Sequence, residues 1–247
     1  MKLRGLVGTL ILLFVWWGIS HSGWIKPILL PPPNAVLIEM SHFLTSPSIL
    51  GDLWLSTERL LVTLSVSILV GVPVGILLGS FKWLADPFEF QIAFFRSLPA
   101  TVLYPLFMVV FGVGELSVKT LIIFASSLII LTYSMDGVKN CPETRIKAAK
   151  SMRLNSFQMF YRVVFPESLP NIITGIRISM SLALILVVVL EMLTGPIAGI
   201  GRRIYDHSQT FRIKEMYAGV VTVGTLGYLL NKGISILDNR FLHWRGR

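Results

Sequence analysis

Four charged residues lie within or beside long apolar runs of this sequence, and their chemistry is the first indication of function. They are Arg59, Arg96, Arg177 and Glu191. Charged side chains at membrane depth are costly, and they usually bind a solute or pair with a partner. An arginine that faces a water-filled path would bind an anion. The alternatives are that the arginines reach the lipid headgroups, or that they pair with Glu58, Glu89 or Glu191.

Residues of other chemistry are too few or too scattered to form a site. The one cysteine is Cys141 and the histidines are His21, His42, His207 and His243, so we expect no metal site. No nucleophile, base and orienting group fall together, so an intramembrane enzyme ranks last among the functions considered. No Gly-x-x-x-x-Gly-Lys-Ser/Thr loop occurs. We therefore expect no catalytic residue and no bound cofactor in this chain.

The elements that carry the charged residues are predicted to be membrane-spanning helices. Only 14% of the 247 residues are charged and 53% are hydrophobic, whereas a soluble domain is about 25% charged. Apolar runs of about 20 residues span a bilayer, and their backbone groups must pair within a helix. The sequence predicts an all-α polytopic membrane protein with one transmembrane domain, residues 1–247. Its six helices are expected at about 5–25, 53–81, 87–112, 115–137, 168–194 and 214–238.

Glycines and prolines modify two of these predicted helices. The second helix carries three glycines at a spacing of four residues, Gly71, Gly75 and Gly79, which puts them on one face and favours close helix packing. Pro99 and Pro105 interrupt the third helix. Such breaks occur in transporters where backbone lines a cavity, and they also occur as simple kinks. Pro99, Thr101 and Tyr104 are therefore further candidates for a translocation pathway.

The net charge of +9 comes from basic residues between the apolar runs, so we expect no nucleic-acid partner. Basic residues gather on the cytoplasmic side of membrane proteins. With the N-terminus inside, the inner bases are Lys2, Arg4, Lys82, Lys139, Arg145, Lys147, Lys150, Arg153, Arg162, Arg240, Arg245 and Arg247. The outer bases are half as many: Lys26, Lys119, Arg202, Arg203, Arg212 and Lys214. The excess of basic residues on the inner side predicts that both termini are cytoplasmic.

The longest polar segment in the second half of the chain, residues 139–170, is predicted to hold two short helices. It is too basic to cross a membrane, yet Ile146, Ala149 and Met152 share one helical face. Asn155 then offers a turn and a helix cap before a second apolar face begins. The sequence therefore predicts two helices that lie under the membrane.

The contacts that this segment would make are of two kinds. The small Ala148 and Ala149 permit close approach by another surface, and Phe157 and Phe160 would fit into a groove of a partner protein. A basic amphipathic segment that rests on anionic lipid explains the same pattern. Physical reasoning alone favours the lipid slightly.

A series of short motifs follows in order along the chain. In the polar segment and just after it they are Lys147-Ala148-Ala149, Phe157, Arg162-Val163-Val164-Phe165-Pro166, Leu169-Pro170 and Gly175-Ile176-Arg177-Ile178. Elsewhere they are Leu29–Val36, Gly71–Gly79, Glu191–Leu193 and Gly199–Gly201. The first set resembles the Glu-Ala-Ala signature of binding-protein-dependent ABC transporter permeases. The second set resembles the nitrate, sulfonate and taurine branch of that family.

The resemblance implies a type I ABC importer permease in the bacterial cytoplasmic (inner) membrane, with residues 139–166 as a coupling loop. The residues that it assigns to ATPase docking are Lys147, Ala148, Ala149, Met152, Arg153, Phe157 and Phe160. It also implies two ABC ATPase subunits that bind ATP and Mg, and a second permease subunit, identical or paralogous. An extracytoplasmic substrate-binding protein and the lipid bilayer complete the implied partners.

Two residues depart from the signature of the family. Lys147 stands where the family has Glu, and Arg153 stands where it has Gly. A glycine at a turn usually allows a positive φ, which costs another residue about 1–2 kcal/mol. We expect Asn155, which tolerates that conformation better, to take over the turn. The charge change at Lys147 predicts a specialised ATPase or pairing with a different permease subunit.

The solute is expected to be small and anionic, like a sulfonate, nitrate or bicarbonate, if an arginine faces the pathway. The pathway candidates are Arg59, Arg96, Pro99, Thr101, Tyr104, Arg177 and Glu191. A secondary transporter or channel without ATP coupling is the alternative function. Proton-coupled carriers commonly hold carboxylates at mid-membrane. Here the acids Glu58, Glu89, Asp136 and Glu191 fall near predicted span ends, which argues against proton coupling.

Overall fold

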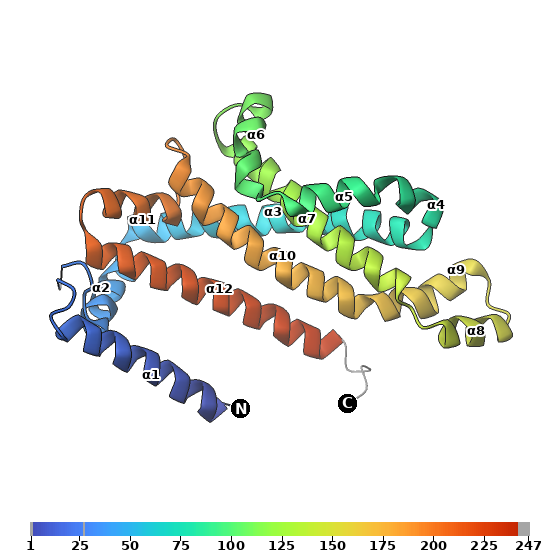
Figure 1. Cartoon of the computed structure of the whole chain (residues 1–247), viewed down its shortest axis with the longest axis horizontal. Helices are drawn as coiled ribbons and strands as arrows, with labels where there is room; N and C mark the ends of the chain where they lie inside the picture. The colour runs from blue at the N-terminus through green and yellow to red at the C-terminus, as the bar shows by residue number, and fades with distance from the viewer. Residues whose placement is uncertain (1, 27, 242–247) are drawn as a thin grey trace. The chain divides into compact units, whose positions relative to one another are not determined.

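The structure is a computed structural model that describes residues 2–26 and 28–241. All regular elements in these two ranges are helices (Figure 1), which confirms the predicted fold class. His243, Arg245 and Arg247, which entered the predictions above, lie outside the described residues. The α-helices are α1 (Lys2–His21), α2 (Pro33–Thr45), α3 (Pro47–Ser80), α4 (Lys82–Ala85), α5 (Glu89–Ser97), α6 (Tyr104–Phe111), α7 (Glu115–Lys139), α8 (Glu143–Ser151), α9 (Ser156–Met159), α10 (Phe165–Leu193), α11 (Ile200–Gln209) and α12 (Ile213–Phe241). Two 3-10 helices, η1 (Asp86–Phe88) and η2 (Ala100–Leu103), and one π-helix, η3 (Phe160–Val164), join some of them.

Three helical runs of the described residues are long and apolar enough to cross a membrane. They are Pro47–Ser80, Glu115–Lys139 and Ser156–Leu193, and a fourth crossing is reached if the bent pair Lys82–Ser97 and Ala100–Phe111 is counted as one span. In α1 the described apolar stretch is the shorter Val7–His21. In α12 the uncharged run extends only from Met216 to Asn231. The total of six spans remains a prediction.

The region of the third predicted span contains two helical segments with a break between them. The chain bends by 97° between its two halves. Leu98 is extended because the residue before a proline is pushed out of the helical region, so α5 ends at Ser97. The predicted break at Pro99 is therefore confirmed. Pro105 does not interrupt a helix, because it lies in the first turn of α6, where a missing N–H costs nothing.

The chain packs as two compact units, one of residues 1–56 with 191–226 and the other of residues 57–190 with 227–247. In the first unit, side chains hold the proline-rich stretch after α1. The Trp16 indole N–H donates to the Pro31 carbonyl at 3.1 Å, and the Ser20 hydroxyl donates to the Leu30 carbonyl at 2.8 Å. These bonds satisfy carbonyls of a segment that cannot form a regular ladder, since its prolines lack N–H groups.

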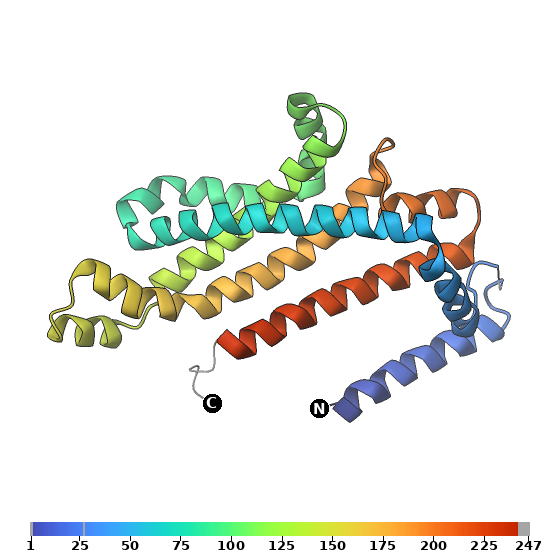
Figure 2. The same ribbon diagram turned by 180° about the vertical axis from the view of Figure 1, so that it is seen from behind.

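The second unit is built around close packing of α3 against α7 (Figure 2). A Cβ atom added at Gly75 would lie 2.3 Å from the carbonyl oxygen of Leu131 in α7. Added Cβ atoms at the other two glycines of the repeat, Gly71 and Gly79, would each lie 2.8 Å from a carbonyl oxygen of α7. The predicted glycine face is therefore confirmed as a helix-packing face, because only a residue without a side chain fits there.

Candidate functional site

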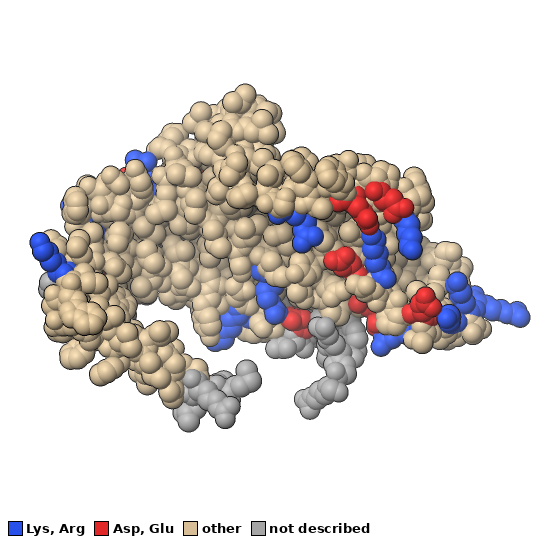
Figure 3. Space-filling model, in the orientation of Figure 1, with Lys and Arg blue, Asp and Glu red and all other residues tan. Residues whose placement is uncertain are grey.

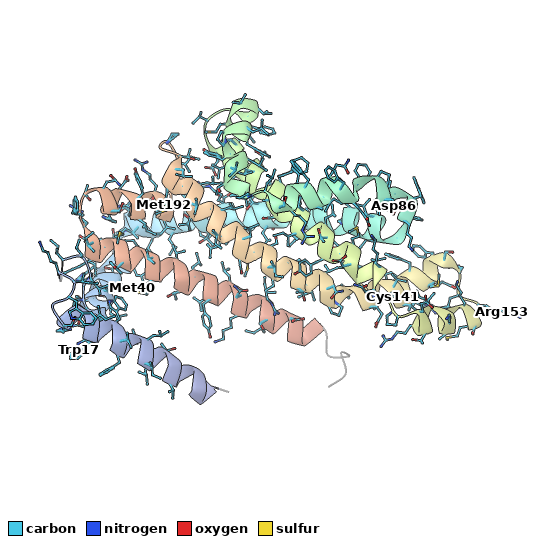
Figure 4. All side chains as sticks on the ribbon, viewed as in Figure 1. Trp17, Met40, Asp86, Cys141, Arg153 and Met192 are labelled. Carbon is cyan, nitrogen blue, oxygen red and sulfur yellow. The ribbon has the colours of Figure 1, made fainter. Side chains whose placement is uncertain are left out.

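The short helix α8 ends in a turn that is fixed by two backbone hydrogen bonds. The Leu154 N–H donates to the Ala149 carbonyl at 3.2 Å, and the Arg153 N–H donates to the Lys150 carbonyl at 2.9 Å. This pair of bonds is the Schellman motif, which requires a left-handed residue just after the helix cap. Arg153, which Figure 4 labels at the tip of the α8–α9 segment, is that residue. Its φ is 54°. The prediction that Asn155 takes over the left-handed turn is therefore wrong.

Asn155 instead caps the next helix, as the prediction of a cap at this position required. It has an extended backbone, with a φ of −71° and a ψ of 166°. Its side-chain oxygen accepts from the Gln158 N–H at 2.8 Å, and the Gln158 side chain accepts from the Asn155 N–H at 3.2 Å. These reciprocal bonds form a capping box at the start of α9.

Arg153→Gly is expected to raise the free energy of unfolding by about 1 kcal/mol, because glycine adopts a positive φ without a steric penalty. Asn155→Ala is the matched control in the same loop, and it should lower the free energy by about 1 kcal/mol through loss of the cap. Thermal unfolding of the two full-length variants in detergent measures both signs. An unchanged or lowered stability of the Arg153 variant would show that the turn carries no strain.

The docking residues predicted in this segment differ widely in exposure. Ala149 is buried against the rest of the unit. Met152 and Phe157 are 73% and 77% exposed, so both are free to enter a partner. Phe160 is half-buried and packs on Phe165 at a ring distance of 6.1 Å. Figures 1 and 2 show α8 and α9 side by side, so the exposed Met152 and Phe157 belong to one hairpin-like tip.

A groove lies between α8 and the start of α10. Its volume is about 540 Å³, and it is lined by Arg145, Ala148, Ala149, Met152, Leu154, Arg162, Val163, Pro166 and Glu167. Arg145 and Glu167 form an ion pair at its edge. The lining is mostly apolar, with Arg145, Arg162 and Glu167 as its charged members, which is the usual composition of a binding pocket.

A second hollow of about 1130 Å³ lies between the end of α3 and the α8–α9 segment, and it includes Cys141 and Phe160. Burial raises the pKa of the Cys141 thiol, the nearby Glu167 adds to the rise, and Arg145 opposes it. The thiol therefore stays protonated and unreactive at neutral pH.

Arg59, the first pathway candidate, is buried and held by an acid that the sequence did not single out. It is 3% exposed, and its guanidinium donates two bonds to the Glu115 carboxylate, at 3.0 and 2.8 Å. Lys119 lies 3.2 Å from Glu115 and 3.8 Å from Glu58, which extends the pair into a charged network. A substitution of Arg59 would therefore change stability as well as any transport.

The other two arginines lie in different settings. Arg177 in α10 pairs with Asp238 in α12 at 2.8 Å, and its own Nε atom is buried without a hydrogen-bond partner among the described residues. Arg96 is exposed in the last turn of α5, just before the break. Glu89, a partner considered for the arginines, lies 3.0 Å from Lys139. Of the three arginines, Arg96 is therefore the one whose charge is presented to the surroundings of this subunit.

The broken third segment brings Arg96 together with the other candidates on the same stretch of chain. Pro99 precedes η2, Thr101 lies within it, and Tyr104 opens α6. Tyr104 is 5% exposed, whereas Pro99 is exposed and Thr101 is half-buried. Irregular backbone at membrane depth occurs where it is covered by protein or lines a water-filled cavity. The break is therefore suited to a pathway or to an interface with another subunit.

Glu191, the last pathway candidate, is completely buried in the first unit, at 0% exposure. Its carboxylate accepts from the Ser56 hydroxyl at 2.8 and 2.9 Å and from the Gly201 N–H at 2.8 Å. The Ser56 oxygen in turn accepts from the Ile200 N–H at 2.9 Å. A Cβ atom added at Gly199 would lie 2.3 Å from Glu191 Cδ. Glu191 therefore satisfies a donor in the first turn of α11 and fixes the loop before it.

Sequence reasoning missed Glu115, Asp238 and Ser56, which are the partners of the predicted site residues. Glu115 had one local signal, since it lies four residues before Lys119 at the start of an apolar helix. Asp238 and Ser56 had no such local signal, because each is distant in sequence from the residue that it contacts. Among residues 2–26 and 28–241, no group of three or more His, Cys, Asp and Glu side chains is arranged to hold a metal. The absence of a metal in the working protein remains a prediction.

Comparison with known proteins gives consistent matches along the chain. The family model described as the binding-protein-dependent transport system inner membrane component matches residues 71–243. The taurine transport system permease protein of Escherichia coli strain K12 is 31% identical over 97% of this chain and 89% of its own length. The bicarbonate transport system permease protein of Synechocystis is 30% identical over 94% of this chain and 85% of its own length.

Solved structures share the fold of this chain. A chain of the MetNI methionine ABC transporter, in an inward-facing conformation, matches with a TM-score of 0.67 and 20% identity. The match covers 84% of this chain and 98% of that one. At this level of identity the likeness shows the arrangement of helices alone.

Proposed function

This chain belongs to the family of binding-protein-dependent transport system inner membrane components, and from that premise we propose that it forms the import pathway for a small anionic solute. It is a membrane-embedded permease subunit of an ATP-driven ABC importer, a class that works with ATPase and binding-protein partners. The observation that carries the proposal is the pair of short helices α8 and α9. Their exposed tip suits docking to an ATPase.

The proposed complex contains two ATPase subunits, two permease subunits and an extracytoplasmic binding protein. In this proposal ATP and Mg bind to the ATPases, and this chain is a non-catalytic subunit without a cofactor. It lies in a bacterial inner membrane with both termini in the cytoplasm. The second permease is either an identical copy or a paralogue. The inner position of the α8–α9 tip agrees with the basic residues of residues 139–170.

The α8–α9 tip is mechanically joined to a spanning helix. Residues from Ser156 to Leu193 form one continuous helical run that includes α9, η3 and α10. A displacement of the tip by a closing ATPase pair would therefore move α10 without an intervening flexible loop. The π-helix η3 lies between tip and span, and such π-turns are frequent at functional sites.

Phe157→Ala is expected to weaken retention of the ATPase by about tenfold or more and to abolish uptake, since a large exposed aromatic is the usual anchor of an interface. Phe211→Ala is the matched control, because Phe211 is also exposed, at 74% compared with 77% for Phe157, and lies outside the segment. The measurement is ATPase co-purification with the full-length chain, followed by vanadate-sensitive, ATP-dependent uptake into vesicles. Uptake that needs no ATPase and ignores vanadate would favour the alternative, a secondary transporter or channel.

The anionic solute is proposed from the basic pathway candidates and from the relatives, whose names specify taurine and bicarbonate. Both compounds carry an anionic group, and a guanidinium binds such groups strongly. Arg96→Ala is therefore expected to reduce uptake of an anionic solute by about tenfold while ATPase retention is unchanged. Lys214→Ala, which removes an exposed base at the start of α12, is the control. Full uptake by the Arg96 variant would remove Arg96 from the pathway.

A further inference from the structure

The α8–α9 segment and its flanks carry an excess of positive charge that the chain itself does not neutralise (Figure 3). Three bases of residues 139–170 are paired: Lys139 with Glu89, Arg145 with Glu167, and Lys147 with Glu143. The other three bases, Lys150, Arg153 and Arg162, are exposed and form no ion pair within residues 2–26 and 28–241. A docking face with three such bases needs negative charge from elsewhere, because burial of an unpaired charge is costly.

The shape of the segment indicates which kind of partner supplies the negative charge. Arg162 lines the groove of about 540 Å³ together with the apolar Leu154 and Val163, and the one acid of the lining, Glu167, pairs with Arg145. A concave, mostly apolar site with a few placed polar groups is the form of a ligand pocket, and on a docking face the group that enters it is a side chain of the partner. The bases continue around the tip at Lys150 and at the turn residue Arg153, next to the exposed Met152 and Phe157. Apolar anchors at the centre with charges around them are the anatomy of a protein interface.

We propose that the ATPase surface that receives the α8–α9 tip is acidic and sets a carboxylate side chain into the groove beside Arg162. The inference rests on the docking role proposed above and adds the chemistry of the partner. A carboxylate matches the planar fork of Arg162 with two parallel hydrogen bonds. Acidic groups around it would neutralise Lys150 and Arg153.

The charge pattern also makes the interface selective. A basic ATPase surface would face Lys150, Arg153 and Arg162 with charges of the same sign, which weakens association strongly. Lys147 adds to this selection, although it is partly neutralised by Glu143 at 3.1 Å. The partner is therefore distinguished from other ATPases by its acidic receiving surface.

The direct test is zero-length cross-linking of the full-length chain with its ATPase, purified together in detergent. The ATPase is identified by mass spectrometry of a peptide with the Gly-x-x-x-x-Gly-Lys-Ser/Thr loop. A water-soluble carbodiimide activates a carboxylate, and a lysine amine in contact with it then forms an amide. We expect an amide between Lys150 and an Asp or Glu of the ATPase. Cross-links from Lys150 only to this chain, with the ATPase still bound, would overturn the proposal.

Charge reversal tests the contribution of each base to binding. Lys150→Glu and Arg162→Glu should each weaken ATPase retention by about tenfold at low salt. The reversal Lys214→Glu makes the same change of net charge outside the segment and should leave retention unchanged. Retention by the unmodified chain should also fall as salt rises, since the screening length shrinks from about 10 Å at 0.1 M to about 3 Å at 1 M.

The failures of the two proposals are distinguishable. If Phe157→Ala releases the ATPase and neither charge reversal does, the docking role stands and the acidic partner surface is wrong. If none of the three variants releases the ATPase, the docking role itself is wrong.

Binding of the variants to vesicles of phosphatidylcholine, with and without phosphatidylglycerol, tests whether the bases bind the membrane in place of the ATPase. Charge reversal that weakens binding to anionic vesicles and spares the ATPase would assign the bases to lipid and overturn the proposal.

Discussion

Glu191→Ala is expected to lower the free energy of unfolding by about 3 kcal/mol and to abolish uptake. The carboxylate is fully buried and accepts bonds from Ser56 and Gly201. Its removal leaves the buried Gly201 N–H without this acceptor, at about 1–3 kcal/mol, and creates a cavity, whereas the Ser56 hydroxyl keeps its bond to the Asp52 carbonyl at 3.1 Å. Glu191→Gln keeps the volume of the side chain and one acceptor oxygen, so it should lower the free energy of unfolding by less. Chemical unfolding of the purified full-length chain measures both.

Two further variants make this prediction specific. Glu39→Ala removes a half-exposed acid of α2 and should change stability by less than about 0.5 kcal/mol. Gly199→Ala should be severe in the native background, since its Cβ would lie 2.3 Å from Glu191 Cδ. In the Glu191→Ala background the same change should cost less, because the contact with Glu191 is gone and only the strain of the positive φ of Gly199, 158°, remains. Additive effects of the two substitutions would show that Glu191 does not occupy this position.

Gly75→Ala is expected to lower the free energy of unfolding by about 1–3 kcal/mol. The added methyl group would lie 2.3 Å from the Leu131 carbonyl oxygen and 2.6 Å from Ser134 Cβ, so α3 and α7 must move apart. Backbone atoms cannot rotate away as the end of a side chain can, and overpacking of this kind destabilises a core. The loss should appear in detergent unfolding curves and in a lower yield of folded protein.

Gly233→Ala in α12 is the matched control for this substitution. Apart from the backbone of α12 itself, no heavy atom of the described residues lies within 4 Å of a Cβ atom at Gly233, and the position is helical. Alanine is a better helix former than glycine by about 1 kcal/mol, so this variant should be slightly more stable than the native chain. Opposite signs at two helical glycines would establish that contact with α7, and not helix propensity, decides the effect. A gain of stability at Gly75 would contradict the packing of α3 against α7.

The features that followed from sequence are those with local causes. Gly71, Gly75 and Gly79 share a face because of their spacing alone. The end of α5 before Pro99 follows from a clash between neighbouring residues. The cap at Asn155 follows from a side chain that reaches only three residues ahead. The turn at Arg153 was assigned to the wrong residue, because the steric preference of asparagine was weighed without the hydrogen bonds that end α8.

The sequence by itself determined that this chain is an all-helical membrane protein, where the short helices of residues 139–170 lie, and which charged residues are candidates for function. Only the tertiary structure decided what holds those charges. Arg59 and Glu115 are 56 residues apart, Arg177 and Asp238 are 61 apart, and Ser56 and Glu191 are 135 apart. Helical periodicity acts over a few residues, so it fixes the face on which a charge lies. The partner across a helix interface depends on how separate helices pack, and that is set by the fit of whole surfaces.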